Sequence, residues 1–251
     1  INLLALSVVQ IEDNLSMSST TRAAVVAFAK NLCEEVAADG ITINNVLPGS
    51  ILTDRLEQVT AMQASHFGDD PEQAMQARVD RIADGLLRHL PLETRARSSI
   101  LRAVLHPQQG SSPEQTSDET GMRGFVIWPL SLVAGRHGLD ELDVTLGLLK
   151  DMTKRFSSEF GIRYPLIHDQ DRVLKALSSW LDDPDPAVRR LVSEGTRPRL
   201  PWAQQLPRLI ADPTPALPLL HHLRDDPSDY VRRSVANHLN DISKAHPDLL
   251  V

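Results

Sequence analysis

A short motif that recurs in the C-terminal half of the chain places the strongest constraint on the fold. Asp-Asp-Pro, followed after three residues by Val-Arg-Arg-x-Val, begins at Asp182 and begins again at Asp225, an offset of 43 residues. Arrays of paired helices have repeats of about 40 to 47 residues, and each unit buries its apolar face against the next. The offset therefore predicts a stack of helix pairs with one continuous core.

In each copy we expect the Asp-Asp-Pro turn to end one helix and start the next, with the proline in the first turn, where a missing N–H is tolerated. A fainter copy lies upstream, where Lys154 to Glu159 matches Arg189 to Glu194 at an offset of 35 residues. Three successive helices would then place basic and acidic groups on one concave face. Alternatively, the arginines form ion pairs within the scaffold.

The N-terminal part has a different pattern. Ile1 to Val9 is expected to form a strand, Ser19 to Ala38 an amphipathic helix, and Ile41 to Val46 a second strand, an order typical of a parallel sheet. From Pro71 onward the strand-like runs stop. Apolar residues at helical spacing then predict a helix that buries Met75, Val79, Ile82, Leu86 and Leu90.

These patterns together predict a mainly α-helical fold, in which a HEAT-like solenoid over residues 83–251 follows a partial α/β, Rossmann-type fragment over residues 1–82. The junction should lie within residues 65 to 85. The stretch from His106 to Gly121, rich in Gln, Gly, Ser and Glu, is expected to be a mobile loop.

Charge is unevenly distributed along the chain. The net charge of −7 belongs to residues 1–85, whereas residues 86–251 carry equal numbers of basic and acidic side chains. Basic residues are in excess from Pro186 to Lys244, which favours a nucleic-acid partner for this stretch. A lone Cys33 cannot form an intrachain disulfide, so we expect a reducing cytoplasm. The apolar start of the chain is too short to span a membrane, and no membrane association is expected.

Residues 1–82 resemble the short-chain dehydrogenase/reductase family. Three stretches carry the resemblance: Ser18–Val25, Gly40–Gly49 and Thr53–Arg55. The family uses a tyrosine and, four residues later, a lysine for hydride transfer, and here Ser18 and Arg22 stand at these positions. Serine is a much weaker acid than tyrosine, and arginine stays protonated. The glycine-rich turn that binds a dinucleotide is also missing, so we expect a structural remnant in a fragment or fusion, without a cofactor.

The C-terminal two thirds resemble the AlkC branch of the AlkC/AlkD DNA alkylation repair glycosylases. Four motifs in the expected order carry this resemblance: GFVIWPL from Gly124, RFSSEFGIR from Arg155, SEGTRPRLPW from Ser193, and DPSDYVRRSVANHLNDISKAHPD from Asp226. The resemblance implies a HEAT-like solenoid that cups duplex DNA and acts in base excision repair. It also implies hydrolysis of the N-glycosidic bond of cationic methylated bases, such as 3-methyladenine and 3-methylcytosine, without a deep base-specific pocket.

This chemistry suits the residues. A cationic base leaves without protonation, so the enzyme must stabilise an oxocarbenium-like sugar and orient a water, which are tasks for ionised carboxylates near arginines. The resemblance implies that Glu159, Glu194 and Asp241 are the acidic site residues, with Asp241 and Glu194 as the main pair, and that Trp202 contacts the lesion sugar and backbone. Which carboxylate holds the water stays open.

Other basic and amide side chains are expected to bind DNA phosphates and sugars, because guanidinium forks suit phosphate oxygens. They are Arg189, Arg190, Arg197, Arg199, Arg232, Arg233, Asn237, Asn240 and Lys244. Trp128 and Trp180 are expected in the core, and His221 and His222 on the surface. No metal-binding spacing is present, so neither a metal nor another cofactor is expected.

Two rival functions stay open: a non-catalytic HEAT-repeat scaffold that binds DNA through its arginines, and a dehydrogenase-like oxidoreductase. The family's own N-terminal helices are replaced by the dehydrogenase-like piece, and the chain stops at Val251, soon after Asp241. The expectation from sequence is therefore a truncated, monomeric DNA-3-methyladenine-type glycosylase, cytoplasmic and associated with the nucleoid.

Overall fold

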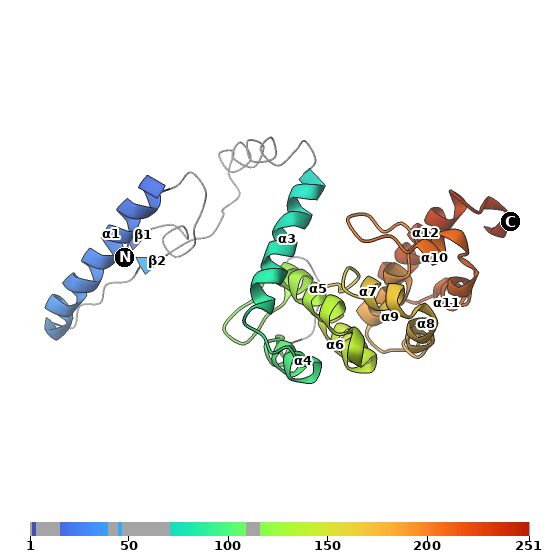
Figure 1. Ribbon diagram of the computed structural model, residues 1–251, viewed down its shortest axis with the longest axis horizontal. Coiled ribbons are helices and arrows are strands. Elements are labelled where there is room, and N and C mark those ends of the chain that lie inside the picture. Colours follow the sequence, from blue (N-terminus) through green and yellow to red (C-terminus); the bar gives the residue numbers. More distant parts are fainter. Residues whose placement is uncertain (1, 4–15, 40–44, 47–70, 109–115, 251) are drawn as a thin grey trace. The chain divides into compact units, whose positions relative to one another are not determined.

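The computed structural model describes residues 2–3, 16–39, 45–46, 71–108 and 116–250, and it divides into two compact units, Ile1–Asp69 and Asp70–Val251 (Figure 1). None of the described helices is both long enough and apolar enough to cross a membrane.

The first unit contains a short parallel pair of strands and one long helix. Strand β1 (Asn2–Leu3) pairs with β2 (Asn45–Val46) in the register Asn2↔Asn45 and Leu3↔Val46. Between them lie α1 (Ser16–Val36) and a 3-10 turn, η2 (Ala37–Asp39). The helix and parts of both strands match the sequence prediction, and the remaining residues of the predicted strands lie outside the described residues.

The second unit is built from helices joined by short turns. Its elements in chain order are α3 (Pro71–Leu87), α4 (Thr94–Ala103), η3 (Gly124–Val126), α5 (Ile127–His137), η4 (Leu139–Glu141), α6 (Leu142–Thr153), α7 (Arg163–His168), α8 (Gln170–Ser178), α9 (Pro186–Gly195), α10 (Pro207–Ala211), η5 (Thr214–Ala216), α11 (Leu217–Leu223), α12 (Asp229–Ser243) and η6 (Pro247–Leu250).

These helices pack so that each covers the apolar stripe of its neighbours. Helix α5 packs on α3, α6 and α7, helix α6 on α4 and α9, and helix α9 on α11 and α12 (Figure 1). One continuous apolar core runs from Val79 in α3 to Ile242 in α12. It includes Trp128 and Trp180, as predicted, whereas His221 and His222 are exposed, also as predicted.

The two units divide between Asp69 and Asp70, within the predicted junction region of residues 65 to 85 but before the predicted domain boundary at residues 82 and 83. That boundary falls inside α3, which is continuous and packs on α5, so the whole helix belongs to the second unit. The predicted buried stripe of α3 is also wrong at one position, because Ile82 is 50% exposed and Ala83 is buried instead. The small Ala83 side chain allows α3 to lie close to its neighbour.

The predicted loop from His106 to Gly121 is described only at its two ends. His106 is buried, and its ring nitrogen Nε2 lies 3.1 Å from an oxygen of Asp118. Leu105 forms an isolated β-bridge with Met122, and Asp118 forms another with Gly121. Both described ends of the predicted mobile loop are therefore held by contacts, and its residues 109–115 lie outside the described residues.

The repeated turns precede helices as predicted, but their prolines do not lie in the first helical turn, and only the first turn supplies a side-chain cap. Helix α9 begins at Pro186, and its capping residue Asp185 accepts a hydrogen bond from the Ala187 backbone N–H. Pro184 therefore precedes the cap. In the second copy Pro227 likewise lies outside the helix, because α12 is preceded by Ser228. Pro184 and Pro227 thus lie in the turns before α9 and α12 and are not part of the first helical turn.

The first arginine of each copy folds back onto its own turn. Its Nη1 atom donates to the carbonyl oxygens of the second aspartate and of the proline: Arg189 to Asp183 and Pro184, and Arg232 to Asp226 and Pro227. The two copies also meet directly, since Arg189 forms a two-point ion pair with Asp226 at 2.7 and 2.9 Å. This arginine position therefore joins one repeat to the next.

Candidate active site

Two of the predicted acidic residues lie on the facing sides of α9 and α12. Glu194 is in the last turn of α9, and Asp241 is in α12, and each is only 4% exposed. Both face the interface because α12 buries a polar stripe of Ser234, His238 and Asp241 at helical spacing. The packing of these two helices therefore brings two carboxylates into a protected place.

Arg197 lies between these two carboxylates. Its Nη1 donates to Glu194 Oε1 at 2.7 Å, and its Nε donates to Asp241 Oδ2 at 2.9 Å. Burial alone would lower the pKa of Arg197, but hydrogen bonds and the charges of Asp241 and Glu194 raise the pKa above its ordinary value. Arg197 is therefore a permanent cation between two anions.

The third predicted carboxylate is tied to this pair through a second arginine. Arg190 Nη1 donates to Glu159 Oε2 at 2.7 Å, and Arg190 Nη2 lies 3.6 Å from Glu194 Oε2. Burial lowers the pKa of Arg190, but the negative charges of Glu159 and Glu194, together with Tyr230, raise it overall. Glu159, Arg190, Glu194, Arg197 and Asp241 thus form an alternating chain of charges, which we call the charge chain.

Glu159 is held by a loop, not by a helix as the faint third copy predicted. The residues from Lys154 to Glu159 follow the end of α6 and precede α7. This loop lies directly on the α5 backbone, because a Cβ added at Gly135 would collide with the carbonyl oxygen of Gly161. Close backbone contact at these two glycines fixes the position of Glu159 relative to the helices.

One carboxylate oxygen of the charge chain differs from the others in its hydrogen bonding. Glu159 Oε2 accepts hydrogen bonds from Ser157 and Arg190, whereas its Oε1 has no hydrogen-bond partner among the described residues. In contrast, both oxygens of Glu194 are bonded, one to Arg197 and one to Ser234 at 2.7 Å. Both oxygens of Asp241 accept from Arg197, at 2.9 and 3.3 Å. Glu159 therefore has the carboxylate oxygen that is most open to a new ligand.

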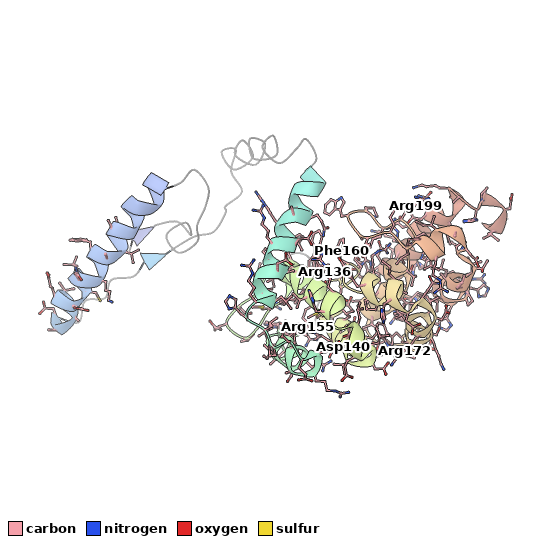
Figure 2. All side chains as sticks on the ribbon, in the orientation of Figure 1. Arg136, Asp140, Arg155, Phe160, Arg172 and Arg199 are labelled. Atoms are coloured by element: carbon pink, nitrogen blue, oxygen red, sulfur yellow. The ribbon has the colours of Figure 1, made fainter. Side chains whose placement is uncertain are left out.

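Trp202 lies on the loop after α9 with its ring partly in solvent. It is 47% exposed, and its backbone φ of 62° lies in the left-handed region, which is unusual for a residue other than glycine. Its ring is nearly parallel to that of the buried Trp128, with centroids 6.3 Å apart, and Trp128 stacks on Phe160 at 4.1 Å. Phe160 comes from the same loop as Glu159 (Figure 2). The aromatic layer thus borders the charge chain.

The other predicted DNA-binding residues divide by exposure. Arg233, Asn237, Asn240 and Lys244 are exposed along α12 at the spacing of one helix face. Arg233 pairs with Asp229 at 2.7 Å, and Lys244 lies 4.0 Å from Asp241. The exposed Arg199 makes no ion pair or hydrogen bond with the described part of the chain (Figure 2). Arg189 and Arg232 are engaged by the turns described above.

Sequence reasoning missed three residues that hold the site together. Ser234 donates to Glu194, and the buried His238 has its Nδ1 2.9 Å from the Ser193 carbonyl oxygen. Arg163 is completely buried and bonds the loop that carries Arg197. The spacing of Ser234, His238 and Asp241 on one helix face was an available signal, because polar residues on a buried face require partners.

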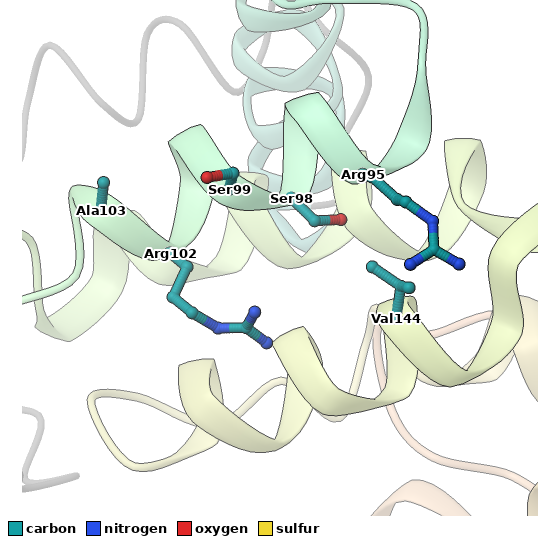
Figure 3. Close-up of a pocket in the computed structure, with 6 residues that line it drawn as sticks. All are labelled: Arg95, Ser98, Ser99, Arg102, Ala103 and Val144. Carbon is teal, nitrogen blue, oxygen red and sulfur yellow. The ribbon is translucent and has the colours of Figure 1, made fainter.

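A shallow groove between α4 and α6 shares no residue with this site. It is lined by Arg95, Ser98, Ser99, Arg102, Ala103 and Val144 (Figure 3). Its two arginines are paired, Arg95 with Glu141 and Arg102 with Asp151, each at 2.7 Å. Among the described residues, no cluster of three or more His, Cys, Asp or Glu side chains could hold a metal ion. The charge chain is therefore the stronger candidate for chemistry.

Comparisons with known proteins separate the two units. The short-chain dehydrogenase family model matches residues 6–64. The 3-oxoacyl-[acyl-carrier-protein] reductase FabG of Haemophilus influenzae is 55% identical over 42 residues, 17% of this chain and 17% of FabG. This similarity agrees with the expected dehydrogenase resemblance, but it is too short to show a Rossmann-type fold.

The larger match covers most of the rest of the chain. The uncharacterized protein YhaZ of Bacillus subtilis is 38% identical over 182 residues, 72% of this chain and 47% of YhaZ. The solved structure of the Pseudomonas fluorescens alkylpurine DNA glycosylase AlkC, bound to DNA containing an abasic site analog, is similar at 39% identity and a TM-score of 0.59. That match covers 68% of this chain and 44% of AlkC.

The chain thus spans less than half the length of each of these relatives. The predicted mainly helical repeat fold is nevertheless confirmed, because an identity of 39% accompanies the same arrangement of helices. The helical part of this chain has an AlkC-like fold.

Proposed function

We propose that the second unit is a DNA glycosylase module that hydrolyses the N-glycosidic bond of cationic alkylated bases in duplex DNA. The charge chain is the observation that carries this proposal, because it brings together three carboxylates and two arginines from α9, α12 and two adjoining loops. Similarity to AlkC, whose solved structure holds DNA with an abasic site analog, supports a DNA substrate.

The proposed chemistry needs negative charge more than a proton donor. A methylated base with a positive charge is already a good leaving group, so the difficult species is the oxocarbenium-like sugar. Carboxylates that are fixed before the reaction stabilise such a cation without reorganisation, and they act most strongly where water is excluded. Arg190 and Arg197 fix the orientation of Glu159, Glu194 and Asp241 through ion pairs, and the formal charges of the five groups sum to one net negative charge.

The same arrangement suggests how a water could be oriented. Within the charge chain, Glu159 Oε1 is the carboxylate oxygen that has no hydrogen-bond partner among the described residues. The other oxygen, Oε2, accepts hydrogen bonds from Ser157 and Arg190. We therefore assign to Glu159 the role of orienting the attacking water. Glu194 and Asp241 would stabilise the positive charge on the sugar. Trp202 would contact the lesion sugar and backbone, as its half-exposed ring allows.

Duplex DNA is expected to follow the exposed polar face of α12. Arg233, Asn237, Asn240 and Lys244 share this face, and Arg199 adds a cation that is free of ion pairs in the described part of the chain. These side chains can bind phosphate and sugar oxygens, which position a protein on DNA without reading its sequence. Recognition of the lesion would then depend on its charge and lability.

The test is release of 3-methyladenine from duplex DNA by the full chain. Asp241→Asn and Glu194→Gln keep the side-chain size and remove the charge, and each should lower the rate about 10²- to 10³-fold, as for loss of one preorganised electrostatic group. Asp143→Asn is the control, because that carboxylate is 80% exposed and, among the described residues, pairs with Arg172 alone. DNA binding without base release would instead support the non-catalytic scaffold.

A further inference from the structure

Arg163, the first residue of α7, is a completely buried cation that binds backbone instead of carboxylates. Its guanidinium donates to the carbonyl oxygens of Gly195 at 3.2 Å, Arg197 at 2.9 Å and Pro198 at 3.4 Å, and also to that of Gln204. No carboxylate among the described residues lies within ion-pair distance of it. All of its acceptors belong to one segment, residues 195–204.

A buried guanidinium group needs hydrogen-bond acceptors such as these carbonyl oxygens. Burial, and then the positive charge of Arg197, lower the pKa of Arg163 to about 10, so the side chain remains protonated at neutral pH. A charge in the interior is tolerated only where each N–H finds an oxygen, and a guanidinium offers five in a fixed plane. The carbonyl groups of residues 195–204 must therefore keep the positions that satisfy this fork.

The segment held in this way carries two side chains of the candidate site. Arg197 lies near its start and joins Glu194 to Asp241, whereas Trp202 lies near its end with a left-handed backbone. Arg163 bonds the segment on both sides of Trp202, at Pro198 and at Gln204. A loop fixed at these points has little freedom to move either side chain.

We propose that Arg163 is a positioning residue that sets the geometry of both Arg197 and Trp202. It acts through the backbone of residues 195–204 and touches neither carboxylate. Its effect on the loop is independent of the reaction, whereas its effect on catalysis rests on the proposed glycosylase function. The two effects can therefore be measured separately.

A second buried arginine provides a matched control. Arg97 in α4 is also almost fully buried, and it donates to the carbonyl oxygens of Pro91, Leu92 and His137. It fixes a different turn, and none of its partners belongs to the charge chain. Arg97→Met and Arg163→Met thus remove the same kind of interaction at two places, and only one of these places is next to Trp202.

The first readout is acrylamide quenching of tryptophan fluorescence in the full chain. Trp202 is the exposed tryptophan, whereas Trp128 and Trp180 are buried, so quenching reports mainly on the loop, and Trp202→Phe gives the baseline. We expect Arg163→Met to increase quenching and to weaken the exciton signal of Trp128 and Trp202 in circular dichroism. We expect Arg97→Met to change neither, although both variants should lower the melting temperature.

The second readout is base release from duplex DNA. Arg163→Met should lower kcat about 10²-fold, the effect of a small misplacement of catalytic groups, with little change in KM. Arg163→Lys, which keeps the charge but not the planar fork, should recover part of kcat and part of the normal quenching. If Arg163→Met does not fold, Arg163→Lys alone carries both readouts.

Normal quenching and a normal exciton signal in a folded Arg163 variant would overturn the proposal. Equal changes in Arg97→Met would also overturn it, because they would show a general loss of stability. If the unaltered chain releases no base, the proposed function fails. The quenching comparison still decides whether Arg163 positions the loop.

Discussion

The two copies of the repeat, residues 182–197 and 225–240, have the same turn and helix but bury different side chains. In the first copy Glu194 and Arg197 are buried and joined to each other, whereas their counterparts in the second copy, Asn237 and Asn240, are neutral and exposed. Equivalent sequence positions thus carry buried charged side chains in the first copy, where Arg197 lies just after α9, and exposed neutral side chains on α12 in the second. The packing differs at these positions, because α9 is covered by α6, α11 and α12, whereas this face of α12 is exposed.

The largest expected effect comes from giving the first copy the residue of the second. Arg197→Asn leaves Glu194 and Asp241 buried without their shared cation, and it should destabilise the second unit by about 3–5 kcal/mol. Asn240→Arg, the reverse exchange on the exposed face, should change stability by less than about 0.5 kcal/mol. Urea unfolding followed by tryptophan fluorescence measures both. Similar effects in the two variants would remove the proposed difference between the copies.

A second difference concerns Gly195 and its counterpart His238. Burial lowers the pKa of His238 from 6.5 to about 4, so the unfolded chain takes up this proton at a higher pH than the folded chain. The free energy of unfolding should therefore fall as the pH drops from about 6.5 to 4, by roughly 3 kcal/mol in total.

The variant His238→Gln should flatten this dependence, even if its stability at pH 7 is lower. The exposed His221 supplies the control, since His221→Gln should leave the pH profile of the unaltered chain in place. Urea titrations at pH 7, 5.5 and 4 would be compared. A steep profile that persists in His238→Gln would assign the acid sensitivity to another group.

The smallest effect is expected on the outer face of the second copy. If Arg233 and Lys244 each bind a phosphate, Arg233→Gln and Lys244→Gln should each reduce the salt dependence of duplex binding, the slope of log K against log salt, by about 0.9. Arg172→Gln, on α8 and paired with Asp143, should leave the slope unchanged. Identical slopes in all three variants would show that DNA does not follow α12.

Much of the helical unit could be predicted from sequence because it depends on local patterns. The offset between Asp182 and Asp225 predicted repeated helix pairs, and Trp128 and Trp180 were expected in the core, where both lie. The change of pattern at Pro71 placed the junction within residues 65 to 85, where the units divide, whereas only the packing of α3 on α5 shows that residues 71–82 belong to the second unit. The exposure of Ile82 also depends on how α3 packs on α5, which the spacing of apolar residues alone does not give.

The candidate site was predicted in its residue types but not in its connections. Glu194 and Asp241 lie together as expected, yet Glu159 reaches them from a loop through Arg190. The arginine pairs could not be separated by sequence, because Arg189 and Arg190 are adjacent and chemically identical. Only the packing shows that Arg189 bonds Asp226 across the repeats while Arg190 bonds Glu159. The role of Arg163 could not be predicted from the sequence, because its partners are backbone carbonyl oxygens, which every residue type has.

The left-handed backbone of Trp202 has a thermodynamic consequence. A residue with a Cβ costs about 1–3 kcal/mol in a strained backbone region of this kind, so the surrounding contacts must oppose relaxation of the loop. Because that cost is met when the chain folds, a ligand that touches the indole ring finds it already ordered and loses little entropy on binding. If the proposed contact of Trp202 with DNA holds, a chain with a relaxed backbone at residue 202 would be more stable and would bind DNA less tightly.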